Sequence, residues 1–154
     1  MAHSFGSVIM SDYIYDMQKK QGESGSVEGI SQLEQFNTLA GIITFGTPMA
    51  LYSLQQNSDF AKPINIVGSA LPEKIKERVK WTNYYDKDDI IAYPLKGINE
   101  TYNALVEGDY EINVGSAATS WNPACHNGYW EDKDFYKPVA AYFAELRAEH
   151  TFWK

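Results

Sequence analysis

Apolar residues recur at three-to-four-residue spacing near the start of the chain, which predicts an amphipathic helix over residues 5–20. Its broad apolar face comprises Phe5, Val8, Ile9, Met10, Tyr13, Ile14 and Met17. Lys19 and Lys20 end the helix, where positive charge is favourable at the negative end of its dipole. Residues 21–29 are rich in Gly and Ser and predict a loop.

Three short runs of β-branched and aromatic residues have the composition of strands. The first lies within 41–48 and stops at Gly46 and Pro48, and the second covers 79–85. The third covers 110–114, where polar and apolar residues alternate. A helical turn is expected over 49–56 and a short helix over 72–78, whereas 57–71 give no clear pattern.

Residues 115–133 predict a long loop, and the last helix is expected over 134–150. Asp134 can cap that helix, and Pro138 is expected in its first turn, where proline is tolerated. Its buried stripe is predicted to contain Val139, Tyr142, Phe143 and Leu146.

Strands that alternate with helices predict an α/β fold, with a mostly parallel sheet flanked by helices. At 154 residues the chain is long enough for one domain, residues 1–154. Ligands bind such sheets at the carboxyl ends of the strands. Ser4 precedes a helix, Asp89 follows a strand and His126 lies in a loop after a strand, so all three are expected at that edge.

Composition narrows the possible partners. The net charge of −7 repels a phosphate backbone, so nucleic acid is not an expected partner. No run of about 18 apolar residues exists, so no transmembrane segment is expected. Cys125 is the single cysteine, which excludes an internal disulfide and a thiolate metal cluster. That cysteine content is compatible with the cytoplasm but leaves the location open.

The pentad Ala2-His3-Ser4-Phe5-Gly6 has the form of a nucleophile elbow, a sharp strand-to-helix turn that exposes a serine hydroxyl. A serine needs a base to take its proton, usually a histidine oriented by a carboxylate. His3 adjoins Ser4 and cannot readily reach its hydroxyl.

His150 is expected at a solvated helix end, so His126 remains as the predicted base. Three aromatic residues around it, Trp121, Tyr129 and Trp130, can exclude water or serve as ordinary packing. The plain alternative is that His126 is an ordinary loop residue held by hydrogen bonds.

These motifs together resemble the C-terminal half of an α/β-hydrolase of the lipase and esterase kind. The elbow is followed by Thr44-Phe45-Gly46-Thr47-Pro48, which resembles the strand after the elbow. The segment Trp81–Ala92 resembles the turn that bears the acid, and His126 with Tyr129 and Trp130 resembles the histidine loop. The order Ser, Asp, His is that of the family. The small residues Ala2 and Gly6 are expected to permit a close approach of strand and helix.

The resemblance implies a serine hydrolase that acts on ester-like bonds through Ser4, His126 and Asp89, with no metal or cofactor. Members of the family often place the acid just before an x-Val/Ile-Ala/Pro step, and Asp89 before Ile90-Ile91-Ala92 fits this pattern best, whereas Asp88 is the alternative acid. Asp86 is expected to close the strand or stabilise the loop. The N–H of Phe5 is the expected oxyanion donor. The resemblance also implies a small-molecule or lipid ester as the substrate.

In the family, further strands and a loop with the second oxyanion donor precede the elbow. We therefore expect the N-terminal strands to be absent from this sequence and the sheet edge to be exposed, which favours association. The alternative function is a catalytically incomplete hydrolase fragment, or a binding or scaffold domain derived from a hydrolase.

Overall fold

The centre of the protein is a sheet of four parallel strands in the order β1-β2-β3-β4, flanked by helices, so the chain is an α/β protein. The computed structural model describes residues 1–25, 30–55, 64–115 and 123–151. The strands are β1 (Ala2–His3), β2 (Ile42–Phe45), β3 (Trp81–Tyr85) and β4 (Val106–Glu111). Each strand pairs with the next along the chain, and β1 and β4 form the two edges.

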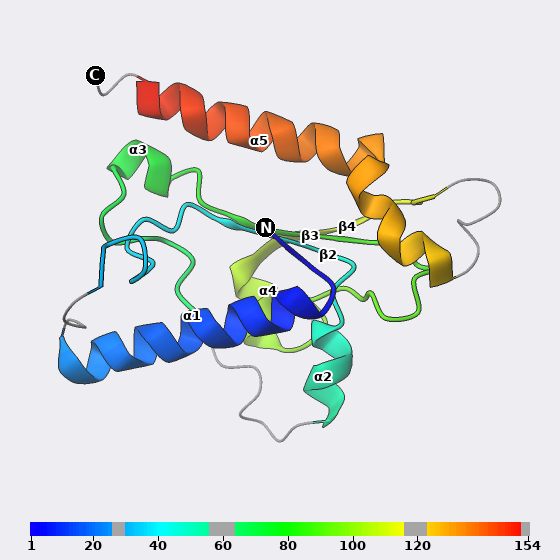
Figure 1. Cartoon of the computed structure of the whole chain (residues 1–154), viewed down its shortest axis with the longest axis horizontal. Helices are drawn as coiled ribbons and strands as arrows, with labels where there is room; N and C mark the ends of the chain where they lie inside the picture. Colours follow the sequence, from blue (N-terminus) through cyan, green and yellow to red (C-terminus); the bar gives the residue numbers. More distant parts are fainter. Residues whose placement is uncertain (26–29, 56–63, 116–122, 152–154) are drawn as a thin grey trace.

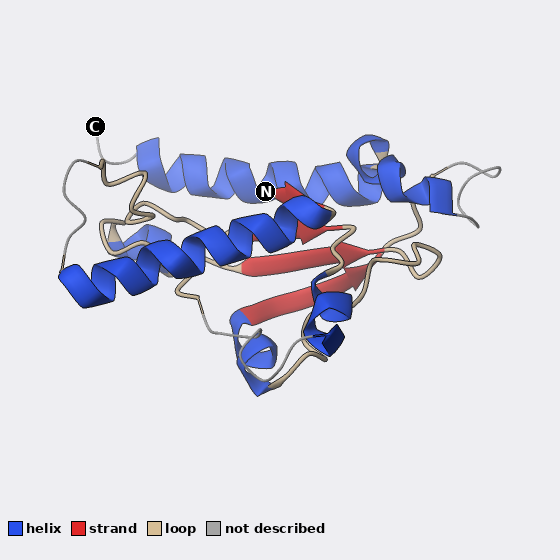
Figure 2. Ribbon diagram, turned by 60° about the horizontal axis from the view of Figure 1, so that its bottom comes forward, coloured by secondary structure: helices blue, strands red, loops and turns tan. Residues whose placement is uncertain are grey.

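Helices cover both faces of the sheet. They are α1 (Phe5–Ser24), α2 (Met49–Gln55), α3 (Glu73–Lys76), α4 (Glu100–Leu105), the 3-10 helix η1 (Pro123–Glu131) and α5 (Lys133–Thr151). Figure 1 shows the sheet nearly edge-on, with α5 on one side and α1, α2 and α4 on the other. Figure 2 shows the strands fanned between these layers. Within the described residues, no helix is both long and apolar enough to cross a membrane.

Two hydrophobic cores lie on opposite faces of the sheet because successive strand side chains point to opposite sides. On the α1 face, Ile42 and Trp81 pack with Val8 and Ile14 of α1. On the α5 face, buried residues of the sheet, of η1 and of α5 pack together: Ile43, Phe45, Tyr84, Val114, Cys125, Tyr129, Phe135, Val139 and Tyr142. All four residues of β2 are buried, as expected for a strand of a parallel sheet that is covered on both faces.

The first helix is confirmed, but it extends four residues beyond 20 and ends at Ser24, followed by Gly25 at positive φ. Its predicted apolar face is partly wrong. Val8, Ile14 and Met17 are buried, whereas Phe5, Ile9 and Tyr13 are 48%, 58% and 54% exposed. The small side chains of Ser7 and Ser11 are buried on this helix instead.

The third predicted strand corresponds to β4, which lies earlier in the chain than predicted. It occupies Val106–Glu111 rather than 110–114. Gly108 and Asp109 disfavour strands by intrinsic propensity, yet here they pair with Thr82 and Asn83. The carboxylate of Asp109 accepts hydrogen bonds from Asn83 Nδ2 and from two backbone N–H groups. Tertiary contacts therefore determine this strand. The preceding helix α4 was not predicted from the sequence. It is capped by Asn99, whose side chain accepts from the Tyr102 N–H.

Three predictions about the last helix, α5, are wrong. It begins at Lys133, and Asp132 rather than Asp134 caps it, accepting from the Asp134 N–H at 2.8 Å. Pro138 lies inside the helix, beyond the first turn. Of the predicted stripe, Val139 and Tyr142 are buried but Phe143 is exposed.

Candidate active site

Ser4 occupies a sharp turn between β1 and α1. Its backbone has a φ of 53° and a ψ of −139°, a region that residues with a side chain rarely adopt. Such a conformation costs about 1–3 kcal/mol and persists only where the surroundings impose it. The Ser4 N–H donates to the Phe45 carbonyl at 3.1 Å, which continues the pairing of β1 with β2. The sheet and α1 together therefore hold the Ser4 hydroxyl at the end of β1.

A line of buried hydroxyl groups supports this turn from the α1 side. Ser7 Oγ donates to the Ser4 carbonyl at 2.6 Å, and Thr47 Oγ1 donates in turn to Ser7 Oγ. The Met49 N–H donates to Thr47 Oγ1 at 3.3 Å. These bonds connect the turn to the segment after β2. The expected close approach at Gly6 is wrong, since a Cβ there would meet no described atom within 4 Å.

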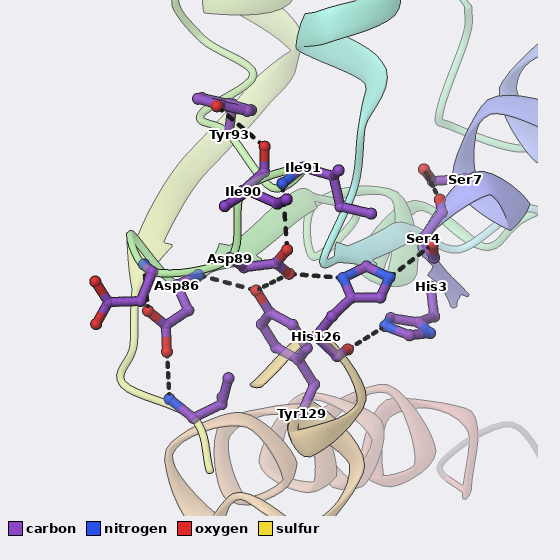
Figure 3. Close-up of polar contacts among 12 residues, drawn as sticks. His3, Ser4, Ser7, Asp86, Asp89, Ile90, Ile91, Tyr93, His126 and Tyr129 are labelled. Atoms are coloured by element: carbon purple, nitrogen blue, oxygen red, sulfur yellow. Dashed lines mark hydrogen bonds and ion pairs between the residues drawn. The ribbon is translucent and has the colours of Figure 1, made fainter. Parts of the chain in front are cut away.

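His126 and Ser4 come from opposite ends of the chain and meet at the carboxyl edge of the sheet (Figure 3). His126 Nε2 lies 2.8 Å from Ser4 Oγ, and His126 Nδ1 lies 2.7 Å from Asp89 Oδ2. A carboxylate only accepts, so Nδ1 carries the proton and donates to Asp89. Nε2 is then free of hydrogen and accepts the Ser4 hydroxyl proton. This tautomer is the one a general base requires.

Asp89 is the carboxylate that contacts His126. Its side chain is 1% exposed and that of His126 is 17% exposed, so the pair is largely shielded from water. Tyr129 Oη donates a second hydrogen bond to Asp89 Oδ2 at 3.0 Å and accepts from the Asp86 N–H at 2.9 Å. Burial, followed by the charge of Asp89, raises the pKa of Tyr129, so its hydroxyl keeps the proton that it donates.

The two neighbouring aspartates have different surroundings. Asp86 is buried, and its carboxylate accepts from the N–H groups of Asp88 and Val114 at 2.8 and 2.6 Å. It therefore fixes the loop, the role that the sequence favoured for it. Asp88 is partly exposed, and the hydrogen bond to His126 comes from Asp89 rather than from this alternative acid.

The aromatic residues around His126 differ from one another. Tyr129 is fully buried, whereas Trp130 is 56% exposed and Trp121 lies outside the described residues. His3, which the sequence excluded as the base, stacks on the His126 ring and contacts the His126 carbonyl rather than Ser4 Oγ. The side chain of His150 is outside the described part. Sequence patterns gave no signal for the contacts of Tyr129 or His3, since both depend on residues far along the chain.

Cys125 is a potential rival nucleophile beside His126, but its environment makes it unreactive. The side chain is fully buried, and burial, followed by the charges of Asp86, Asp89 and Asp88, raises its pKa to about 11. The thiolate is the reactive form, so little of it exists at neutral pH. Across the described parts of the chain, His, Cys, Asp and Glu side chains form no group of three that could hold a metal ion.

Phe5 is the first residue of α1 and follows Ser4 directly. The first four N–H groups of a helix have no acceptor within the helix. The Phe5 N–H therefore belongs to the groups that could bind an oxyanion beside Ser4. The exposed Phe5 ring packs on Tyr52 of α2, with centroids 5.5 Å apart.

Comparisons with known proteins add no relative: no family model, no curated protein and no solved structure matches the chain. The geometry of the site therefore has to carry any functional argument.

Proposed function

We propose that the protein is a serine hydrolase of the α/β-hydrolase fold that acts on ester-like bonds. The observation that carries this proposal is the pair of hydrogen bonds from Ser4 to His126 and from His126 to Asp89, at 2.8 and 2.7 Å. Two further features support it: the strained Ser4 backbone and the helix N-terminus that begins at Phe5. Strained residues cluster at active sites, where they serve the mechanism.

The reaction follows from these positions. Ser4 Oγ attacks the ester carbonyl carbon while His126 Nε2 takes the hydroxyl proton. Asp89 holds the imidazole tautomer and stabilises the imidazolium that forms. The Phe5 N–H donates to the oxyanion of the tetrahedral intermediate. His126 returns the proton to the leaving alcohol, and an acyl group remains on Ser4. Water then attacks the acyl carbon while His126 takes its proton. His126 returns this proton to Ser4 Oγ as the acyl–oxygen bond breaks, which releases the carboxylic acid and restores the Ser4 hydroxyl.

A fluorophosphonate probe tests the assignment of Ser4 directly. The probe reacts with serines activated by a base, so we expect one adduct per chain, located by mass spectrometry on the peptide that contains Ser4. Ser4→Ala should abolish labelling, whereas the control Ser53→Ala should leave it unchanged, because Ser53 Oγ donates to the Ala50 carbonyl within α2. Labelling that survives Ser4→Ala would refute the proposal.

One observation favours a second candidate, a catalytically incomplete hydrolase or a binding domain derived from one. An oxyanion hole uses two donors. Beside Ser4, the Phe5 N–H at the start of α1 is the one donor assigned among the described residues, so the second donor of a complete hole is not accounted for. Hydrolysis of p-nitrophenyl acetate and butyrate by residues 1–154 separates the candidates. Sustained turnover that requires Ser4 supports the hydrolase. Labelling of Ser4 without turnover supports the incomplete form.

A further inference from the structure

His3 contacts His126 and precedes Ser4 in the chain, but it is not part of the hydrogen-bonded series Ser4–His126–Asp89. It is the last residue of β1, and Ser4 follows it directly. Its ring stacks on two sides, against Phe45 at a centroid distance of 5.0 Å and 22°, and against His126 at 4.7 Å and 30°. The Trp130 ring meets its edge at 6.0 Å and 70°. Packing on several sides therefore fixes the orientation of this ring.

The ring also makes a hydrogen bond that joins the two halves of the site. His3 Nε2 lies 2.9 Å from the backbone carbonyl oxygen of His126. A carbonyl only accepts, so His3 Nε2 carries a proton and donates it. Figure 3 shows this contact below the bond from His126 to Ser4. Burial is the main cause that lowers the pKa of His3, which favours a neutral ring at pH 7.

Two separate sets of contacts hold His126 in position, one at its ring and one at its backbone. Asp89 holds Nδ1, so it determines the tautomer and the rotation of the ring. The backbone of η1, which carries the ring, must also be fixed relative to Ser4, although 122 residues separate the two. The contact from His3 to the His126 carbonyl spans this gap, and His3 is covalently bonded to Ser4. The distance from His126 Nε2 to Ser4 Oγ therefore depends on a short series of contacts, from Ser4 through the His3 side chain to the His126 backbone.

We propose that His3 is a positioning residue, whose Nε2–H holds the His126 backbone so that the His126 ring stays within hydrogen-bond reach of Ser4. This role deepens the proposed function and rests on it. Gly46 provides the space for the ring, since a Cβ at Gly46 would lie 3.0 Å from His3 Nε2 and 3.0 Å from the Tyr129 ring.

Three substitutions separate the hydrogen bond from the stacking. His3→Gln can place an amide N–H near the position of Nε2, whereas the shorter amide of His3→Asn cannot reach it. His3→Phe keeps the stacked ring and removes the donor. We expect His3→Phe and His3→Asn to slow fluorophosphonate labelling of Ser4 by about tenfold or more, since supporting contacts of this kind are worth 10- to 100-fold. His3→Gln should stay within about threefold of wild type.

The pattern among the variants decides the outcome. A wild-type rate in His3→Phe, with a slow His3→Gln, would mean that stacking alone matters and would overturn the proposal. Equal rates in His3→Gln and His3→Asn would overturn it as well. Because both of these lack the ring, any shared loss of stability cancels in their comparison, which keeps the test valid if His3→Phe folds poorly.

A second readout does not depend on catalysis. The proton on His126 Nδ1, bonded to Asp89, should give a downfield signal in the proton NMR spectrum that disappears in His126→Gln. We expect this signal to broaden in His3→Phe and His3→Asn and to persist in His3→Gln. The NMR pattern can hold even if Ser4 never reacts with the probe, in which case the proposed function fails but the positioning contact stands. An unchanged signal in all three variants would refute the positioning role.

Discussion

At the scale of single residues, burial and hydrogen-bond partners separate three aspartates that lie within four positions. Asp89 contacts His126, Asp86 binds the backbone of its own loop, and Asp88 is partly exposed. Tyr129 reinforces the difference, since its hydroxyl donates to Asp89 and accepts from Asp86 N–H. The environment of each carboxylate therefore distinguishes Asp89 as the one that contacts His126, which is the position of the acid in the proposed mechanism.

Substitution of Asp89 by Asn tests this assignment. The amide keeps the size of the side chain but no longer favours the tautomer with the proton on Nδ1, nor does it stabilise the imidazolium. We expect the rate of Ser4 labelling and of ester hydrolysis to fall by about three to four orders of magnitude. The measurement is kcat/KM on a p-nitrophenyl ester, with near-ultraviolet circular dichroism to verify the fold.

Asp88→Asn is the matched control for that experiment, because it removes the same charge one position away. Its rate should stay within about threefold of wild type, as surface changes remote from buried partners have small effects. If Asp88→Asn were the more damaging of the two changes, the alternative acid would be correct.

The sequence predicted the site residues where few residues of the required chemical type were present. Three histidines and one elbow-like pentad left few combinations, and the predicted order of strands put Ser4, Asp89 and His126 at one sheet edge. The contacts of His3 and Tyr129 were not predictable in this way. His3 bonds to a carbonyl 123 positions away, and Tyr129 bonds to Asp89 40 positions away. Such contacts depend on how η1 packs, for which a sequence has no periodic signal.

At the scale of elements, the turn after β2 couples the sheet to the site. Gly46 has a φ of +57°, its N–H donates to the Tyr84 carbonyl, and a Cβ at this position would press against the rings of His3 and Tyr129. Both its backbone conformation and the space around it therefore require glycine.

Gly46→Ala should lower the free energy of unfolding by about 1–3 kcal/mol, because it combines an unfavourable φ with contacts at 3.0 Å. The new methyl group should also displace His3, so Ser4 labelling should slow at temperatures where the variant remains folded. Urea unfolding, monitored by tryptophan fluorescence, gives the first quantity.

Gly97→Ala is the control for this change, since a Cβ at Gly97 meets no described atom within 4 Å and its φ is not in the left-handed region. It should change the free energy of unfolding by less than about 0.5 kcal/mol. Equal effects of the two substitutions would contradict the role assigned to Gly46.

Elements were predictable where local pattern and tertiary environment agree. The predicted run 41–48 contains β2, which begins one residue and ends three residues inside it, and the predicted run 79–85 begins two residues before β3 and ends with it. The strand β4 was misplaced because Gly108 and Asp109 oppose a strand locally and are held by pairing with β3. The start of α5 was missed by one residue, because Asp132 and Asp134 are equally good capping types and only the structure distinguishes them.

At the scale of the whole molecule, the sheet ends at β1, which pairs with β2 and has no second neighbour in the described residues. The adjoining helix α1 exposes Phe5, Ile9 and Tyr13 at four-residue spacing. An open strand edge beside an exposed apolar helix face favours association with another chain.

We therefore expect the protein to self-associate as its concentration rises, which sedimentation velocity would detect as an increase in the weight-average sedimentation coefficient. Ile9→Lys places a charge on the exposed face of α1 beside the β1 edge, and it should shift the distribution toward monomer. Phe143→Lys is the control, since Phe143 is exposed on α5, on the opposite face of the sheet. A monomer at all concentrations, or equal dispersal by both substitutions, would contradict association through the β1 edge and the exposed side of α1.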